Sequence, residues 1–134
     1  MSISLSEIST PALAYLGDSV LELCVREMLV DLGISSAKAL NSAALSFVRA
    51  ETQANAMIKL LPVLSDEESA VYRRGRNVGH TNVPKNATVG QYRMATGMEA
   101  LFGYLHLLGR DARIRELFSL AYKDEIAAIR SQEK

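Results

Sequence analysis

Two acidic residues stand in apolar, helix-like segments far apart in the chain. Asp18 lies within LGDSVL (residues 16–21) and Glu99 within GMEALF (residues 97–102). A carboxylate among apolar side chains is costly unless it is paired or holds a cation. Two carboxylates are enough for Mg²⁺, which takes oxygen ligands and keeps several of its waters. The pair therefore predicts one polar site, built from two helices and suited to hold a metal ion.

A basic stretch separates the two acids. Residues 69–98 contain no Asp or Glu, although 15 acids in 134 residues would place about three there. The stretch carries groups that can bind nucleic-acid phosphate, namely Arg73, Arg74, Arg76, Asn77, Lys85, Asn86 and Arg93. Aromatic residues are not interleaved among them, which favours contact with a duplex backbone over stacking on single-stranded bases. The alternative is that these cations form an ordinary solvated face.

Each acid also has a simpler interpretation. Asp18 follows a glycine, so its carboxylate could cap the N-terminus of a helix. Glu22 lies one turn further along, so that stripe of the helix could instead face solvent. Against the cap, the helical phase of residues 11–15 continues through Leu16 and Val20. The phase places Asp18 in the interior of a helix.

The surrounding pattern is helical almost throughout and predicts an all-α fold. Apolar residues recur at helical spacing, whereas alternating strands and internal repeats are absent from the sequence. We expect one domain over residues 1–134, with a charged tail from about residue 124 and a turn-rich loop over 75–90. Helices are predicted over 10–33, with Thr10 as N-cap, over 36–61, with a break near 47–50, and over 65–74, 88–109 and 111–129.

Composition excludes several classes of protein. Apolar residues make up 49% of the chain and the net charge is zero, which is typical of a globular domain rather than of a wholly basic binder. Apolar runs fall short of the roughly 18 residues that a membrane span needs, and the N-terminus does not resemble a signal peptide. Cys24 is the only cysteine, and His80 and His106 lack metal-site spacing. A cytoplasmic protein without a cysteine-based zinc site is expected.

Several motifs, taken in order, resemble the catalytic domain of the ribonuclease III family. LAYLGDSVLE (residues 13–22) resembles the signature helix of that family, and TGMEALFGYL (residues 96–105) resembles its second acidic helix. Between them, RRGRN (residues 73–77), VPKNA (residues 83–87) and QYR (residues 91–93) narrow the resemblance to the Mini-ribonuclease III branch. The resemblance covers residues 10–122.

The resemblance implies a fold, a partner and a reaction. The fold is a single helical bundle that forms a twofold dimer, and the reaction is Mg²⁺-dependent hydrolysis of double-stranded RNA to 5′-phosphate and 3′-hydroxyl ends. The implied substrate is large-subunit (23S) ribosomal RNA precursor rather than a small molecule. Asp18 and Glu99 fall on the catalytic, metal-binding acids of the family. Longer members add a double-stranded-RNA-binding domain, so RNA affinity is expected here from the nuclease domain itself.

The chain departs from the longer members at two positions. Ala14, four residues before Asp18, stands where they have Glu, and Thr96, three residues before Glu99, stands where they have Asp. A further acid of those members has no counterpart in residues 34–50, although the branch shares this thinner set. Fewer carboxylates predict weaker Mg²⁺ binding and a coordination shell completed by water and RNA phosphate.

Two rival functions remain at this stage. The missing acids would suit a non-catalytic RNA-binding or ribosome-assembly module on the same fold, and a helical scaffold without any RNA role is the third reading. For the dimer, the apolar surface near Leu16, Val20 and Phe102 is the candidate interface.

Overall fold

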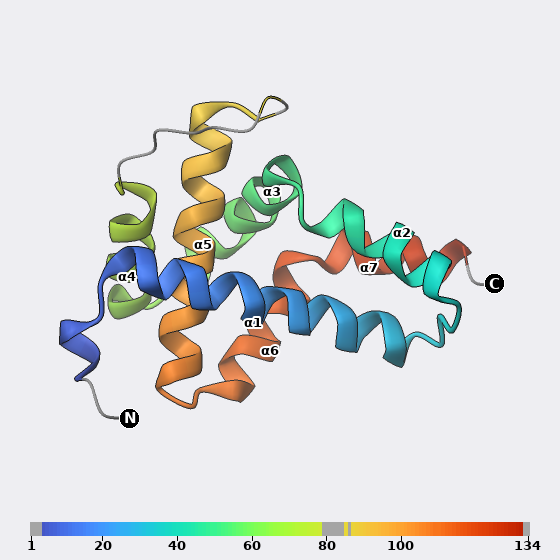
Figure 1. Cartoon of the computed structure of the whole chain (residues 1–134), viewed down its shortest axis with the longest axis horizontal. Coiled ribbons are helices and arrows are strands. Elements are labelled where there is room, and N and C mark those ends of the chain that lie inside the picture. Colours follow the sequence, from blue (N-terminus) through green and yellow to red (C-terminus); the bar gives the residue numbers. More distant parts are fainter. Residues whose placement is uncertain (1–3, 79–84, 86, 133–134) are drawn as a thin grey trace.

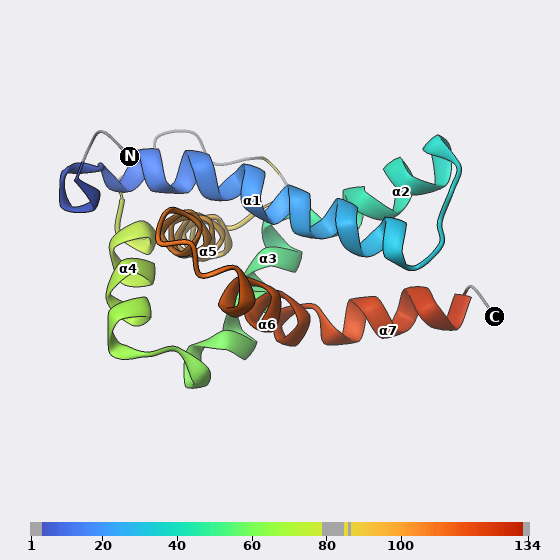
Figure 2. The same cartoon turned by 90° about the horizontal axis from the view of Figure 1, so that it is seen from below.

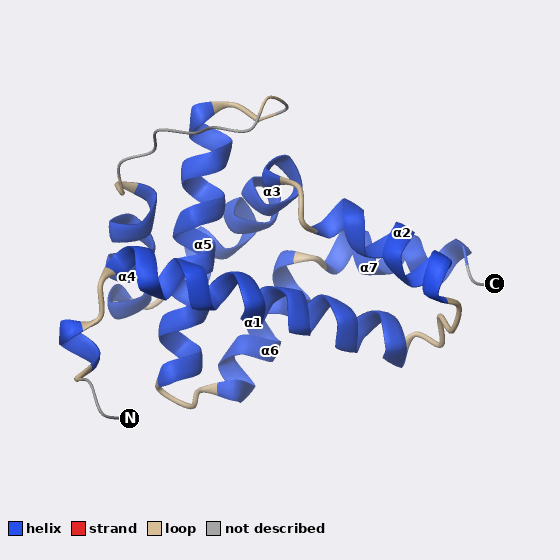
Figure 3. Ribbon diagram, viewed as in Figure 1, coloured by secondary structure: helices blue, strands red, loops and turns tan. Residues whose placement is uncertain are grey.

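A computed structural model describes residues 4–78, 85 and 87–132, and the regular elements of this part are all helical. Figures 1 and 3 show helices and connecting segments, which confirms the all-α prediction. The helices are α1 (Thr10–Asp31), α2 (Ala37–Phe47), α3 (Ala50–Leu60), α4 (Asp66–Arg76), α5 (Val89–Leu107), α6 (Asp111–Ala121) and α7 (Lys123–Gln132). Two short 3₁₀ turns, η1 (Leu5–Glu7) and η2 (Leu61–Val63), precede α1 and α4. Within the described ranges, the helices are too short or too polar to span a bilayer.

A hydrogen-bonding N-cap and a glycine explain where α1 begins and ends, and the N-cap is not the predicted residue. Ser9, rather than Thr10, is the N-cap, and its hydroxyl accepts a hydrogen bond from the Ala12 amide at 3.2 Å. Beyond the other end, Gly33 has a φ of +88°, a left-handed conformation that favours glycine. Asp18 therefore lies well inside α1, and the alternative that it caps a helix is wrong.

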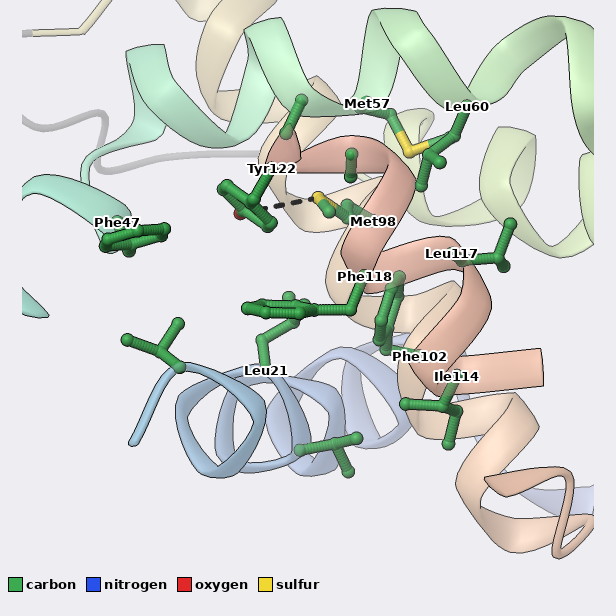
Figure 4. Packing of buried hydrophobic residues seen from close by; sticks show 14 of the residues in the cluster. Leu21, Phe47, Met57, Leu60, Met98, Phe102, Ile114, Leu117, Phe118 and Tyr122 are labelled. Carbon is green, nitrogen blue, oxygen red and sulfur yellow. Dashed lines mark hydrogen bonds between the residues drawn. The ribbon is translucent and has the colours of Figure 1, made fainter. Parts of the chain in front are cut away.

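The C-terminal segment forms two helices where the sequence predicted one over residues 111–129. The break falls at Tyr122, whose φ and ψ of −110° and 21° leave the helical region. Its ring is buried against Phe118 and Phe47, with centroid separations of 4.9 and 5.4 Å, and its hydroxyl lies 4.0 Å from the Met98 sulfur (Figure 4). The burial of this ring in the core accounts for the change of direction, which the local helix pattern does not reveal.

Helix α5 is the centre of the molecule. Figure 2 shows it end-on, with α1 across one side, α3 and α6 on the opposite side and α4 along a flank. Met98, Leu101 and Phe102 are fully buried on it, and Val20 of α1 is buried in the same core. The interface predicted near Leu16, Val20 and Phe102 is therefore wrong for Val20 and Phe102, which pack within one chain, and Leu16 is partly buried against the same core. An apolar pattern in the sequence does not distinguish a side chain of the core from one of a dimer interface.

Helix α4 approaches α5 closely because glycines lie at their contact. A methyl group added at Gly97 would lie 2.7 Å from the Tyr72 ring, and one at Gly75 would lie 2.8 Å from the Gly97 Cα. Both distances are shorter than side-chain carbons tolerate. The glycines thus allow the arginine-bearing end of α4, which extends to Arg76 rather than Arg74, to pack directly beside the helix that carries Glu99.

Candidate active site at the crossing of two helices

The two acids are brought together where α1 crosses α5. At this crossing the backbones touch, because a methyl group added at Gly17 would overlap the Glu99 carbonyl oxygen and lie 2.8 Å from the Gly103 nitrogen. A methyl group at Gly103 would in turn overlap the Leu13 carbonyl oxygen. Asp18 follows Gly17 at this contact, and its side chain lies within hydrogen-bonding and charge interaction of the Glu99 carboxyl. Two distant segments thus bring their acids to one place, and the predicted role of these acids as metal ligands stays a prediction.

Burial differs between the two acids. Asp18 is exposed on α1, and Glu99 is half-buried on α5. Burial, together with the charge and hydrogen bonding of Asp18, raises the pKa of Glu99 to about 8. Two like charges this close do not both ionise readily, so without a cation Glu99 holds its proton at neutral pH. The expectation of an acid enclosed by apolar groups therefore applies to Glu99 and not to Asp18.

Glu68 shows what a carboxylate of this protein looks like when its role is structural. It is 3% exposed on α4, and Arg113 of α6 donates to both of its carboxylate oxygens at 2.9 and 2.8 Å. This hydrogen bonding by Arg113 holds the pKa of Glu68 below its usual range. Glu99 forms no ion pair with a described residue, and its pKa moves the opposite way. A partly buried acid whose neighbour is another acid is the arrangement expected of a functional site.

The donor set around this pair is small. No group of three or more His, Cys, Asp or Glu side chains capable of holding a metal is found among the described residues. Ala14 is buried against Val71 and Ala100, and the Thr96 hydroxyl donates to the Tyr92 carbonyl at 3.0 Å. An adjacent pair of carboxylates with mutual repulsion fits a divalent cation, which would neutralise both charges and leave most of its coordination shell to water or substrate.

Glu22 lies on the same helix as Asp18 but outside this pair. It is exposed and forms an ion pair of 2.7 Å with Arg26, one turn further along α1. Such exposed pairs at a four-residue spacing contribute a few tenths of a kcal/mol, about 0.3–0.5, to helix stability. The alternative of a solvated acidic stripe therefore describes Glu22, whereas Asp18 faces Glu99.

The basic residues of α4 do not form a single cluster. Arg73, Arg74 and Asn77 line a groove of about 460 Å³ together with Tyr104 of α5. Arg76 lies instead over the Tyr72 ring, with its guanidinium carbon 5.8 Å from the centroid, on another flank of the helix. Its Nε donates to the Asn77 side-chain oxygen at 3.3 Å, which links the two groups. Phosphate contacts by Arg74 and by Arg76 would therefore fall on different parts of the surface.

The other predicted RNA-binding residues are only partly placed. Lys85 and Arg93 are both exposed, the first in the loop and the second near the start of α5. Asn86 lies outside the described residues. The structure therefore brings together three of the predicted basic and amide residues in one groove, and it leaves the joint role of the others as a prediction.

Sequence reasoning missed two glycines, a tyrosine and an ion pair that contribute to this region. Gly17 and Gly103 had a readable signal, because a glycine inside a helix costs roughly 1 kcal/mol relative to alanine and so suggests close packing. Tyr104 had no signal, since a tyrosine on an apolar helix is indistinguishable from a core residue. The Glu67–Arg110 ion pair joins α4 to the loop before α6 and depends on tertiary structure alone.

Known proteins similar to this chain include ribonucleases. Residues 11–110 match the family described as Ribonuclease III domain. A protein named Mini-ribonuclease 3 from Enterococcus faecalis is 42% identical over 114 residues, covering 84% of this chain and 86% of that protein. Another of the same name from Desulfitobacterium hafniense is 45% identical over 116 residues, covering 85% and 72%.

One solved structure has a similar fold. A protein of Fusobacterium nucleatum, determined by X-ray crystallography, superposes with a TM-score of 0.81 at 28% identity and covers 92% of this chain and 99% of its own. The family match described above spans both Asp18 and Glu99, so it includes the whole crossing of α1 and α5.

Proposed function

Because the chain belongs to the ribonuclease III family, we propose that it is an endoribonuclease that hydrolyses double-stranded RNA with Mg²⁺. The cleavage would leave 5′-phosphate and 3′-hydroxyl ends. The observation that carries the proposal is the adjacency of Asp18 and Glu99, an acid pair that raises the pKa of its half-buried member. Exposed arginines on neighbouring α4 supply the positive charge that a polyanionic substrate requires.

In this proposal each group has a defined task. Asp18 and Glu99, held by the contact between Gly17 and Glu99, would bind the metal through their carboxylate oxygens. When bound, Mg²⁺ would lower the pKa of a water molecule and neutralise charge on the phosphodiester that this water attacks. Arg73 and Arg74 would hold the RNA backbone through bidentate contacts with phosphate oxygens. Because duplex RNA is recognised mainly by shape, phosphate and 2′-hydroxyl contacts, strong sequence preference is not required.

The proposal includes a natural substrate, a location and a dimer. Large-subunit ribosomal RNA precursor is proposed as substrate, on the resemblance to the Mini-ribonuclease III branch, and the cytoplasm as its location. A twofold dimer would supply one site for each strand of a duplex. Its support is an exposed apolar stripe at seven- and eight-residue spacing on α1, where Tyr15, Leu23 and Val30 are 85%, 56% and 64% exposed.

Cleavage of a labelled RNA duplex tests the proposed activity directly. We expect duplex RNA to be cut in Mg²⁺, to remain intact in excess chelator, and to be cut again when Mg²⁺ is restored. A single strand of the same sequence serves as the control and should stay intact. Salt-sensitive binding of the duplex without any product would contradict the enzyme and support a non-catalytic RNA-binding module instead.

Metal binding should depend on pH because Glu99 must lose its proton. The pKa of Glu99 is raised from an ordinary value near 4.5 to about 8, so metal-free folded protein keeps a proton that the unfolded chain releases. Folding stability without metal should therefore fall as pH rises from about 5 to 8. Mg²⁺ affinity should rise over the upper part of this range, by up to about tenfold per pH unit below 8, and level off above it.

Calorimetric titration of metal-free protein with Mg²⁺, in buffers of different ionisation enthalpy, measures both the affinity and the released proton. We expect release of close to one proton at pH 7 and progressively fewer above pH 8. Glu99→Gln is the control, because it has no proton to release. Binding of equal strength at pH 6 and pH 8 would show that Glu99 is not a metal ligand.

A further inference from the structure

A groove beside α4 carries positive charge that the protein itself does not neutralise. The polar groups that line it are Glu67, Arg73, Arg74, Asn77 and Tyr104, and its volume is about 460 Å³. Arg73 and Arg74 form no ion pair with any described residue, and both are exposed. Two free guanidinium groups beside an amide and a phenol form a set of hydrogen-bond donors suited to phosphate oxygens.

The one acid lining this groove has its charge compensated from outside. The Nη1 of Arg110, which precedes α6, forms a short charged contact with Glu67 Oε1. Burial and the charge of Glu67 raise the pKa of Tyr104, whereas Arg110 and Arg74 oppose this shift, so the phenol lies among all three charges. Arg110 is not among the residues that line the groove. Arg110 can therefore neutralise Glu67 without occupying the space that a ligand would fill.

A second groove adjoins the first at the same two residues. Arg74 and Tyr104 also line a space of about 350 Å³ that is bounded by η1 and by Thr10 and Leu13 at the start of α1. Thr10 precedes Asp18 by eight residues on the same helix, which is about 12 Å along its axis at 1.5 Å per residue. The space beside Arg74 therefore extends to the start of α1, the helix that also carries Asp18.

We propose that the groove of Arg73, Arg74, Asn77 and Tyr104 binds a backbone phosphate of duplex RNA away from the bond that is cut. Arg110 keeps the groove able to bind phosphate, because its ion pair with Glu67 neutralises that carboxylate. This inference rests on the proposed RNA substrate and adds to it a subsite and a positioning residue. Without Arg110, the Glu67 carboxylate would repel the phosphate and attract Arg74 across the groove. The charged side chains that line the groove, Arg73 and Arg74 against Glu67, are positive in sum. The ion pair of Glu67 with Arg110 makes the charge that RNA meets more positive.

The two roles of Arg110 can be separated by a double-mutant cycle in a full-length protein made cleavage-deficient by Asp18→Asn. Duplex RNA binding is measured by fluorescence anisotropy at several salt concentrations. Arg110→Ala should weaken binding about fivefold, and Glu67→Gln should leave it unchanged or tighter. The double variant should bind like Glu67→Gln alone. Arg74→Ala should weaken binding about tenfold and reduce the salt slope by about one.

Lys59→Ala is the matched control, because it also removes one cation from an ion pair, with Asp124 at 2.7 Å between α3 and α7. It should bind RNA like the parent. A double variant as weak as Arg110→Ala would show that Arg110 contacts RNA directly, and unchanged binding in Arg74→Ala would remove the subsite; either result overturns the inference. If the parent does not bind duplex RNA at all, the proposed function itself fails and the subsite falls with it.

Discussion

Asp18→Asn should reduce RNA cleavage by at least about a thousandfold while leaving the fold intact. Loss of one of two carboxylates would remove half of the protein's ligands to the metal, and metal ions supply several kcal/mol of transition-state stabilisation. The asparagine keeps the size of the side chain and loses its charge. Single-turnover cleavage of a labelled duplex at saturating protein measures the chemical step apart from RNA binding.

The same substitution should not destabilise the metal-free protein. Asp18 raises the pKa of Glu99 through its charge and a hydrogen bond. The asparagine oxygen can still accept a hydrogen bond from protonated Glu99, and loss of the charge eases ionisation of Glu99, so the substitution breaks no favourable pair. We expect a thermal midpoint equal to or above that of the parent in chelator. Cleavage at the parental rate would eliminate Asp18 as a catalytic residue, and a lowered midpoint would show that its role is structural.

Gly103→Ala should damage both stability and activity, although it adds only one methyl group. That methyl would overlap the Leu13 carbonyl oxygen, so α1 and α5 must separate. Overpacking of this kind costs about 1–3 kcal/mol, which corresponds to a fall in the thermal midpoint of roughly 10 °C at the upper end. Displacing a catalytic group by about 1 Å can cost a hundredfold in rate, so cleavage should fall well beyond the loss of folded protein. Thermal denaturation and single-turnover kinetics measure the two effects separately.

Gly90→Ala is the matched control on the same helix. A methyl group there would have only the Thr88 hydroxyl within 4 Å, at 3.9 Å, so it fits without strain. Alanine favours the helix, so stability should be unchanged or higher by up to about 1 kcal/mol. A Gly103→Ala protein as stable and active as Gly90→Ala would show that the close contact at the crossing is not required.

Local chemistry explains what the sequence predicted well. The helical phase through Leu16 and Val20 placed Asp18 inside a helix, and α2 and α3 separate near Phe47 as expected. The helix predicted from residue 65 forms as α4, and Ser65 and Glu68 begin it with two reciprocal hydrogen bonds between residues only three apart. These features depend on neighbours in the chain, so one-dimensional reasoning reaches them.

Tertiary packing explains what sequence reasoning could not predict. Apolar spacing does not tell a core residue from a dimer contact, and only the packing of α5 shows that Phe102 lies in the core. Tyr122 breaks the last helix because its ring is held by aromatic residues from α2 and α6. The separation of Arg74 from Arg76 follows from the extra turn of α4, because residues two apart on a helix do not share a face, whereas the sequence predicted that this helix ends at residue 74.

The glycine contact between α1 and α5 has a consequence for how the protein can diverge. Helices separated by side chains shift whenever a substitution changes a side-chain volume, so their relative position drifts as sequences change. Here the main chains of the two helices meet directly at Gly17 and Gly103. Changes of side-chain volume elsewhere in the core therefore leave the distance between the two carboxylates unchanged. Only substitutions at the crossing itself reset it, which allows the remaining sequence to vary widely around a fixed catalytic geometry.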